Sequence, residues 1–415
     1  MKLFCDFFQP RRVQIQNGLY RVENGMKAIA KQATMVLTIA AVMGVGGVSG
    51  FARDIANATV EVRFNGAESR MLLEKNMLHP KVSVDLGDGT AHSFIVDTGA
   101  GVNLIDRSIA ASQGYEVVGE TGIGAPGGAQ IRASIVKVPL FRVGNVTILN
   151  AEFVTMDVIG FSSGTTEGVL GLSLFKNYLV TFDRGAGYIK LSNEKLLPAG
   201  PGTLPYDAAN SQVDIEINVA GKPTRAQIDT GSMGEFLLPA EMMQSLPLQE
   251  AQAASKANLV GGERDIRFAR LQGSIQFAGL QFENPNIAFM TPSPGSGNIG
   301  SGILADYVLA IDQSNHLIAF RKAATANGAS KNAIPRRLGI RFEGLSNVQT
   351  MTISGVAPGS LGEQAGLLAG DVLLAINDKP TAQYDMAALS SIFASQVPLK
   401  LEIERNGTPL VIDIQ

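Results

Sequence analysis

Cysteine, tryptophan and histidine are scarce in this sequence. Its 415 residues include one Cys, no Trp and three His. Cys5 has no second cysteine to pair with, so disulfides, thiol catalysis and thiolate metal sites are not expected. The three histidines, His79, His92 and His316, do not fall in a metal-ligand spacing. We therefore expect neither a metal ion nor another cofactor.

A strong excess of one charge is also missing. The formal net charge is −3, and Lys and Arg form no basic stripe, so nucleic acid is not an expected partner. Glycine, in contrast, is abundant, with 46 residues. Many short runs alternate apolar and polar residues between glycine-containing turns, and this pattern predicts a mainly β fold.

The most informative feature is a short motif that occurs twice. Residues 94–100 read Phe-Ile-Val-Asp-Thr-Gly-Ala, and residues 226–232 read Ala-Gln-Ile-Asp-Thr-Gly-Ser. Each copy ends an apolar strand with an acidic residue, Asp97 or Asp229, followed by Thr and a glycine that allows a sharp turn. One Asp-Thr-Gly alone is weak evidence, because Asp and Gly are ordinary turn residues. Two copies in matching surroundings indicate a duplicated site.

The surroundings of the two motifs do match. Before each motif, a strand and a turn lead to a second strand, which runs into the Asp. After each motif comes an apolar segment that contains glycine, and then another strand. The corresponding segments are residues 81–86 and 213–219 before the motifs, and residues 168–171 with 178–183 and 302–305 with 307–312 after them. In this alignment Ala305 stands where the first copy has Gly171. We therefore expect two copies of one small domain.

Two Asp-Thr-Gly motifs with these surroundings resemble the pepsin and retropepsin aspartic proteases. The resemblance covers roughly residues 81 to 321 and implies two β-barrel lobes related by pseudo-two-fold symmetry. It implies that Asp97 and Asp229 form the catalytic pair. It also implies that four neighbours support the pair, with the two Thr hydroxyls bonding across the axis: Thr98, Gly99, Thr230 and Gly231.

Two adjacent carboxyl groups have a chemistry that suits peptide hydrolysis. They cannot both ionise, so they share one proton and titrate as a unit. The ionised member can take a proton from a water molecule, while the protonated member polarises the peptide carbonyl. The other interpretation is that Asp97 and Asp229 only stabilise turns.

A glycine-rich segment at residues 122–128 stands where these proteases have a flap, a β-hairpin that closes over the substrate. The resemblance assigns Gly124, Gly127 and Gly128 to this flap. In contrast to pepsins, the segment contains no Tyr. We therefore expect its contacts with the substrate to differ from those in pepsins.

The N-terminal segment is predicted to be a leader. Lys27 and Lys31 precede an uncharged run at residues 33–52, which has small residues at positions −3 and −1 from its end, Gly50 and Ala52. This pattern is typical of a signal peptide cut after Ala52, with Met26 as an alternative start, and predicts a periplasmic or extracellular protein. A retained membrane anchor is the alternative, because about twenty uncharged residues can span a bilayer.

The C-terminal segment is predicted to be a separate module. Residues 365–377 read Ala-Gly-Leu-Leu-Ala-Gly-Asp-Val-Leu-Leu-Ala-Ile-Asn and resemble the core signature of bacterial PDZ domains. The resemblance implies an α+β fold. It assigns Leu338, Gly339 and Ile340 to the loop whose backbone N–H groups bind a peptide C-terminal carboxylate. Residues 385–395 are predicted to form a helix beside that groove.

The predicted organisation follows from these segments and from two breaks in the pattern, one between the lobes and one before the PDZ domain. It comprises a leader (1–52), a bridging segment (53–80), protease lobe 1 (81–198), protease lobe 2 (199–322), a linker (323–333) and the PDZ domain (334–415). Within the bridging segment, residues 60–64 alternate apolar and polar residues and are expected to form an edge strand.

Together these features predict an aspartic endopeptidase that hydrolyses polypeptides and binds peptide or protein C-termini through its PDZ domain. A membrane is an expected partner only if the leader is kept as an anchor. The alternative is a non-catalytic peptide-binding or adaptor protein that retains the protease fold.

Overall fold

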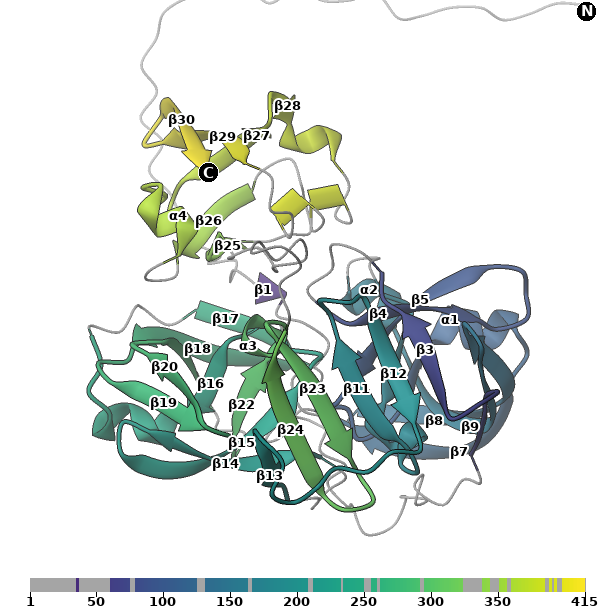
Figure 1. Cartoon of the computed structure of the whole chain (residues 1–415). Helices are drawn as coiled ribbons and strands as arrows, with labels where there is room; N and C mark the ends of the chain where they lie inside the picture. The colour runs from purple at the N-terminus through teal and green to yellow at the C-terminus, as the bar shows by residue number, and fades with distance from the viewer. Residues whose placement is uncertain are drawn as a thin grey trace, which may run out of the picture. The chain divides into compact units, whose positions relative to one another are not determined.

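Figure 1 shows the computed structural model of the chain. The residues that it describes are 35–36, 60–74, 79–124, 131–162, 166–207, 212–232, 234–249, 255–259, 262–291, 295–323, 338–343, 351–356, 360–384, 388–389, 392–393 and 398–414. The chain divides into Met1–Gln32 and Ala33–Gln415, and every described residue belongs to the second unit. Apart from residues 35–36 and residue 323, the predicted leader and linker lie outside the described residues.

Lobe 1 is built on an eight-stranded sheet with the order β2-β9-β6-β10-β5-β4-β8-β7. Its strands are β2 (Glu61–Arg63), β4 (Lys81–Asp85), β5 (Ala91–Asp97), β6 (Leu104–Asp106), β7 (Glu116–Ile123), β8 (Ile131–Val143), β9 (Val146–Met156) and β10 (Gly168–Gly171). An additional pairing of β8 with β9 closes the sheet into a barrel. Two short helices, α1 (Arg107–Ser112) and α2 (Val158–Phe161), complete the lobe. The predicted edge strand is confirmed, because β2 lies at the sheet edge beside β9.

Lobe 2 repeats this plan in a ten-stranded sheet with the order β1-β17-β18-β21-β16-β22-β15-β14-β19-β20. Its strands are β1 (Met35–Val36), β14 (Asp214–Val219), β15 (Lys222–Asp229), β16 (Phe236–Pro239), β17 (Ser255–Leu259), β18 (Gly262–Arg270), β19 (Ser274–Phe277), β20 (Leu280–Glu283), β21 (Asn286–Thr291) and β22 (Gly297–Gly300). The 3₁₀ helix η4 (Ala240–Ser245) and the helix α3 (Ser301–Leu304) follow β16 and β22. In both lobes the predicted hairpin runs into the Asp-Thr-Gly motif, as β4–β5 and as β14–β15.

A third sheet joins the two lobes. Its order is β13-β24-β23-β11-β12-β3. The strands are β3 (Glu68–Leu72), β11 (Leu179–Asp183), β12 (Tyr188–Ser192), β13 (Thr203–Pro205), β23 (Tyr307–Asp312) and β24 (Leu317–Lys322). At its centre, β11 of lobe 1 pairs antiparallel with β23 of lobe 2. The bridging segment therefore contributes the predicted edge strand, β2, to the lobe 1 sheet and a further strand, β3, to the joining sheet.

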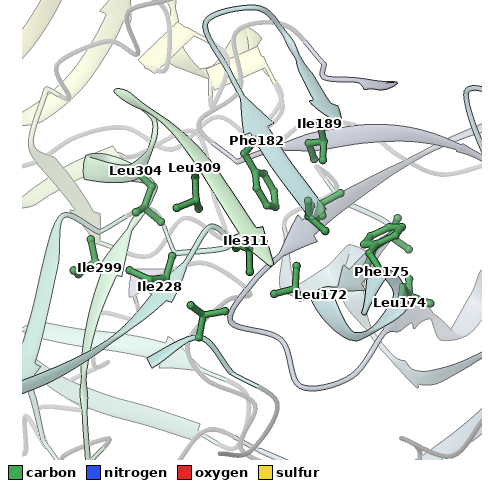
Figure 2. Close-up of a cluster of buried hydrophobic side chains, with 14 of the residues drawn as sticks. Leu172, Leu174, Phe175, Phe182, Ile189, Ile228, Ile299, Leu304, Leu309 and Ile311 are labelled. Carbon is green, nitrogen blue, oxygen red and sulfur yellow. The ribbon is translucent and has the colours of Figure 1, made fainter. Parts of the chain in front are cut away.

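One hydrophobic core runs through both lobes. Figure 2 shows the part of it near the joining sheet, where Phe182 on β11 and Leu309 and Ile311 on β23 lie between residues of the two lobes. Leu172, Leu174 and Phe175, in the 3₁₀ helix η2 (Leu172–Phe175), belong to lobe 1, and Ile228, Ile299 and Leu304 belong to lobe 2. Burial of this continuous apolar surface stabilises the lobes as one body, at about 25 cal/mol per Å² removed from water.

The strand pairing corrects one detail of the predicted repeat. In lobe 1, β10 pairs in parallel with β5, so that Gly171 faces Asp97. In lobe 2, β22 pairs in parallel with β15, so that Gly300 faces Asp229. The sequence alignment that matched residues 302–305 to residues 168–171 is therefore wrong by five positions, and both lobes have glycine beside the motif. An added Cβ at Gly300 would lie 2.3 Å from a backbone oxygen, which explains the requirement for glycine.

The C-terminal segment has a sheet of its own, with the order β25-β26-β27-β29-β30 and β28 paired to β27. Its elements are β25 (Ile340–Glu343), β26 (Met351–Val356), α4 (Leu361–Gln364), β27 (Val372–Ile376), β28 (Lys379–Pro380), the 3₁₀ helix η6 (Thr381–Gln383), β29 (Leu399–Arg405) and β30 (Thr408–Ile414). A separate apolar cluster that includes Ile353, Leu401 and Ile403 fills its core. Of the predicted helix at 385–395, residues 388–389 and 392–393 are helical and the others lie outside the described residues. Within the described parts of the chain, no helix combines the length and the apolar character needed to cross a bilayer.

Candidate active site

The two motif carboxyl groups lie at the ends of equivalent strands. Asp97 is the last residue of β5, and Asp229 is the last residue of β15. Both are nearly inaccessible to solvent, with exposed fractions of 2% and 0%. Each strand is buried over the three residues before its aspartate and lies between neighbouring strands on both sides, so that its final residue is carried into the interior.

The two motifs are in direct contact. The side chain of Asp229 lies against Gly99 of the other lobe: a Cβ added at Gly99 would be 2.6 Å from the Asp229 Cγ atom. No side chain fits at this separation, so the glycine of the first motif is required for the second carboxyl group to approach. The two carboxyl groups are close enough that each changes the pKa of the other. The structure thus brings together the two Asp residues that the sequence predicted to act as a pair.

The threonines exchange hydrogen bonds between the lobes in a symmetric pattern. The Thr98 Oγ1 hydroxyl donates to the Ile228 carbonyl at 2.6 Å and accepts from the Thr230 N–H at 3.0 Å. The Thr230 Oγ1 hydroxyl donates to the Val96 carbonyl at 2.8 Å and accepts from the Thr98 N–H at 3.1 Å. Both threonines are buried, so all four bonds are shielded from water. This network fixes the relative position of the two motif loops.

Backbone donors hold both carboxyl groups, but the two environments are not identical. The Gly99 N–H donates to Asp97 Oδ1 at 2.7 Å. The N–H groups of Gly231 and Ser232 donate to Asp229 Oδ1 at 3.0 and 2.9 Å. Asp229 Oδ2 accepts a further hydrogen bond, at 2.5 Å, from the side-chain amide of Asn298. Asn298 thus breaks the symmetry of the pair.

Burial changes the acidity of both groups. Removal from water raises the pKa of Asp97 to about 6, although N–H donors such as Gly99 oppose the rise. Burial also raises the pKa of Asp229 well above its ordinary value, and the negative charge of Asp97 adds to this rise. Two neighbouring carboxyl groups repel each other when both are ionised, so they lose their protons in separate steps and can share one proton in between. Such a pair can supply a base and an acid at one place.

Two buried carboxamides at this site were missed from the sequence. Gln227 donates from Nε2 to the Gly99 carbonyl at 3.1 Å, which ties the lobe 1 motif to lobe 2. Asn298 donates a hydrogen bond from Nδ2 to the Asp229 carboxyl group. The signal for Asn298 was present in Gly297-Asn298-Ile299-Gly300, which has the same glycine spacing as residues 168–171. The incorrect alignment of the second repeat hid it.

Each lobe has a hairpin that corresponds to the flap predicted in lobe 1. In lobe 1, β7 and β8 pair as far as Ile123 with Ile131, and Gly124 is buried. The other predicted flap residues, Gly127 and Gly128, lie outside the described residues. In lobe 2, β17 and β18 form the equivalent hairpin, which the sequence did not predict as a flap, and β1 pairs with β17 in parallel.

The predicted carboxylate-binding loop of the C-terminal segment leads directly into β25. Leu338 is buried, and Gly339 has a φ of 64°, which favours glycine. The Leu338 carbonyl accepts a hydrogen bond from the Gly362 N–H at 2.8 Å, which anchors the loop to α4. Ile340 then begins β25 and pairs with Val356. The loop is held at both ends.

Comparisons with known protein families agree with this architecture. Residues 82–174 and 213–304 match the family model described as aspartyl protease, once for each lobe. Residues 352–405 match the PDZ domain model. No curated protein matches the chain. The predicted mainly β fold of two barrel-like lobes and a C-terminal PDZ domain is confirmed. The chain therefore contains two repeats that match the aspartyl protease model, followed by a segment that matches the PDZ domain model.

Proposed function

We propose that this protein is an aspartic endopeptidase in which Asp97 and Asp229 activate a water molecule for attack on a peptide bond. The observation that carries the proposal is the pair of buried, neighbouring carboxyl groups at the junction of the two lobes, with the Asp229 side chain against Gly99 of the other motif. A carboxylate that only stabilised a turn would not need a partner carboxylate from the other repeat. Placing two like charges together in the interior is costly unless they share a proton.

The proposed reaction needs no covalent intermediate. The ionised member of the pair takes a proton from water as the oxygen attacks the carbonyl carbon. The protonated member donates a hydrogen bond to the carbonyl oxygen, which becomes negatively charged in the tetrahedral intermediate. Proton transfer to the leaving nitrogen then breaks the C–N bond and returns the pair to its singly protonated state. The Thr98 and Thr230 network keeps both carboxyl groups in place throughout.

Cleavage of an unstructured protein across pH 3 to 8 tests this function. We expect a bell-shaped pH dependence, because the fully protonated pair lacks a base and the fully ionised pair lacks an acid. Because burial raises the pKa of both groups, we expect the maximum at a higher pH than ordinary carboxyl groups would give. A peptide mimic with a hydroxyl-bearing tetrahedral carbon should inhibit the reaction. Absence of cleavage at every pH would favour a binding protein with a protease fold.

The PDZ domain is proposed to bind C-terminal peptides of substrates or partners through the backbone of Leu338, Gly339 and Ile340. Free peptides with an apolar last residue should bind, and amidation of the same peptide should weaken binding at least about tenfold, because the carboxylate loses charge-assisted hydrogen bonds. Isothermal titration with the full chain measures both affinities. Equal affinity for the acid and the amide would show that this loop does not bind a carboxylate.

A further inference from the structure

The two halves of the site differ in polarity at three matched positions. Strand pairing defines which positions match. Val169 pairs with Ile95 in lobe 1, and Asn298 pairs with Gln227 in lobe 2. Val169 and Asn298 each lie two residues before the glycine that faces the aspartate of their own lobe. The matched pairs, with the lobe 1 residue first, are Ile95 and Gln227, Ala100 and Ser232, and Val169 and Asn298. In every pair lobe 1 has an apolar side chain and lobe 2 has a polar one.

Of these residues, the four that belong to strands lie on the face of the sheet that carries the aspartates: Ile95, Val169, Gln227 and Asn298. Side chains alternate along a strand, so Gln227 shares a face with Asp229, two residues later, and Asn298 shares it as the strand partner of Gln227. Their sequence neighbours Ile228 and Ile299 belong to the core behind this face, and Figure 2 shows both there. The contact between Asn298 and Asp229 confirms the placement.

On the lobe 1 side, this face is covered by apolar groups. Ile95 and Val169 belong to a cluster of buried side chains that also contains Ile123, at the end of β7, and Ile135, on β8. The cluster therefore extends from the strands beside Asp97 to the hairpin of lobe 1. A substrate side chain that reached this cluster would meet hydrocarbon.

On the lobe 2 side, Asn298 offers a hydrogen-bond acceptor. The residue is 3% exposed, and its Oδ1 atom has no hydrogen-bond donor among the described residues. Its Nδ2 group donates to Asp229 Oδ2. The opposite orientation of the amide is unfavourable, because it would place the Oδ1 acceptor against another acceptor, the Asp229 carboxylate. The amide geometry turns Oδ1 away from Asp229. A buried acceptor without a donor is unfavourable, and a ligand that brings a donor removes the penalty.

We propose, given the endopeptidase function above, that Asn298 selects a substrate residue whose side chain carries a hydrogen-bond donor. This residue lies on the lobe 2 side of the scissile bond, and the residue on the lobe 1 side is apolar. The substrate class is therefore peptides in which an apolar residue is next to a polar, donor-bearing one such as Asn, Gln, Ser or Thr. A site that bonds a donor discriminates against an apolar isostere because Oδ1 is then left unpaired.

Peptide affinity in the Asp97→Asn variant of the full chain tests the proposal without cleavage. The probes are fluorescent octapeptides whose two central residues are Leu-Asn, Asn-Leu or Leu-Leu, with amidated C-termini so that the PDZ domain is not engaged. Asn and Leu have similar shapes, so the peptides differ mainly in the donor. We expect one of the two mixed peptides to bind at least about tenfold more tightly than Leu-Leu. Equal affinity of all three would overturn the proposal.

Asn298→Val in the same background assigns the preference to this residue. The substitution gives lobe 2 the residue that lobe 1 has at the matched position, and the preference for the mixed peptide should disappear. Val169→Leu is the matched control, because it changes size at the mirror position without changing polarity, and the preference should persist. Circular dichroism checks the fold of each variant. A preference that survives in Asn298→Val would also overturn the proposal.

The outcomes separate this proposal from the function on which it rests. If the wild-type chain cleaves peptides but the Asp97→Asn variant binds all three equally, the endopeptidase function stands and the role of Asn298 is wrong. If the wild-type chain cleaves nothing but the variant prefers a mixed peptide, binding selectivity through Asn298 stands and the endopeptidase function is wrong.

Discussion

Replacing either Asp97 or Asp229 by Asn is expected to reduce peptide cleavage by at least about 10³-fold, because the single remaining carboxyl group cannot act as acid and base in one step. Asn has nearly the shape of Asp, so packing against Gly99 and the backbone donors should survive. Because the two residues act as a unit, the double variant should be little worse than either single one. Initial rates on one unstructured substrate measure all three.

The same variants make a prediction about stability. Burial raises the pKa of Asp97 to about 6 in the folded chain, above the value in the unfolded chain, so the unfolded chain loses its proton first as the pH rises. The stability contributed by this group is present below about pH 4 and is lost as the pH rises through 6. Asp97→Asn has no such titration. The variant should therefore gain stability relative to the wild type between pH 4 and pH 7.

Thermal unfolding followed by circular dichroism at pH 4 and pH 7 measures this gain and also serves as the folding control for the cleavage assay. Near-wild-type cleavage by a well-folded single variant would exclude the two-carboxylate mechanism. If the stability difference between variant and wild type does not change with pH, the pKa of Asp97 is not raised in the folded chain.

Thr230→Val is expected to lower the free energy of unfolding by about 2–5 kcal/mol, because it leaves the Thr98 N–H and the Val96 carbonyl without their buried partner. Val has nearly the same shape as Thr, so the loss reports the hydrogen bonds and not the packing. Cleavage should also fall, by about 10²-fold, because the two motif loops are no longer held in register. Urea unfolding and initial rates measure the two effects.

Thr230→Ser is the matched control for this prediction. It keeps the hydroxyl and removes one methyl group, which costs about 1 kcal/mol. The serine variant should therefore keep both cross-lobe hydrogen bonds and most of the activity. If Ser and Val at this position behave alike, the hydroxyl is not what positions the loops.

The lobes and the pairing of the two aspartates could be predicted from sequence because they depend on a local pattern that occurs twice, and the PDZ domain could be predicted because its signature is a single continuous segment. A hairpin that runs into Asp-Thr-Gly is visible in alternation and glycine placement, and its duplication predicts a shared site. The exchange of hydrogen bonds by Thr98 and Thr230 agrees with the role that the resemblance implied.

Features that depend on strand partners could not be predicted in the same way. Asn298 contacts Asp229 only because β22 lies beside β15, and the sequence separation of 69 residues gives no local signal of that pairing. The alignment error at Ala305 arose because residues 302–304, Gly-Ile-Leu, in α3 resemble residues 168–170, Gly-Val-Leu, of β10 in lobe 1. Parallel register, unlike a hairpin, is not marked by a turn.

The joining sheet has a consequence for how the site responds to dilution. A site assembled from two separate chains forms only while the chains are associated, so its occupancy falls as protein concentration falls. Here β11 and β23 belong to one covalent chain, and their pairing is an intramolecular event with a fixed, high effective concentration. Both aspartates therefore remain together in a single molecule, however few molecules are present in its surroundings.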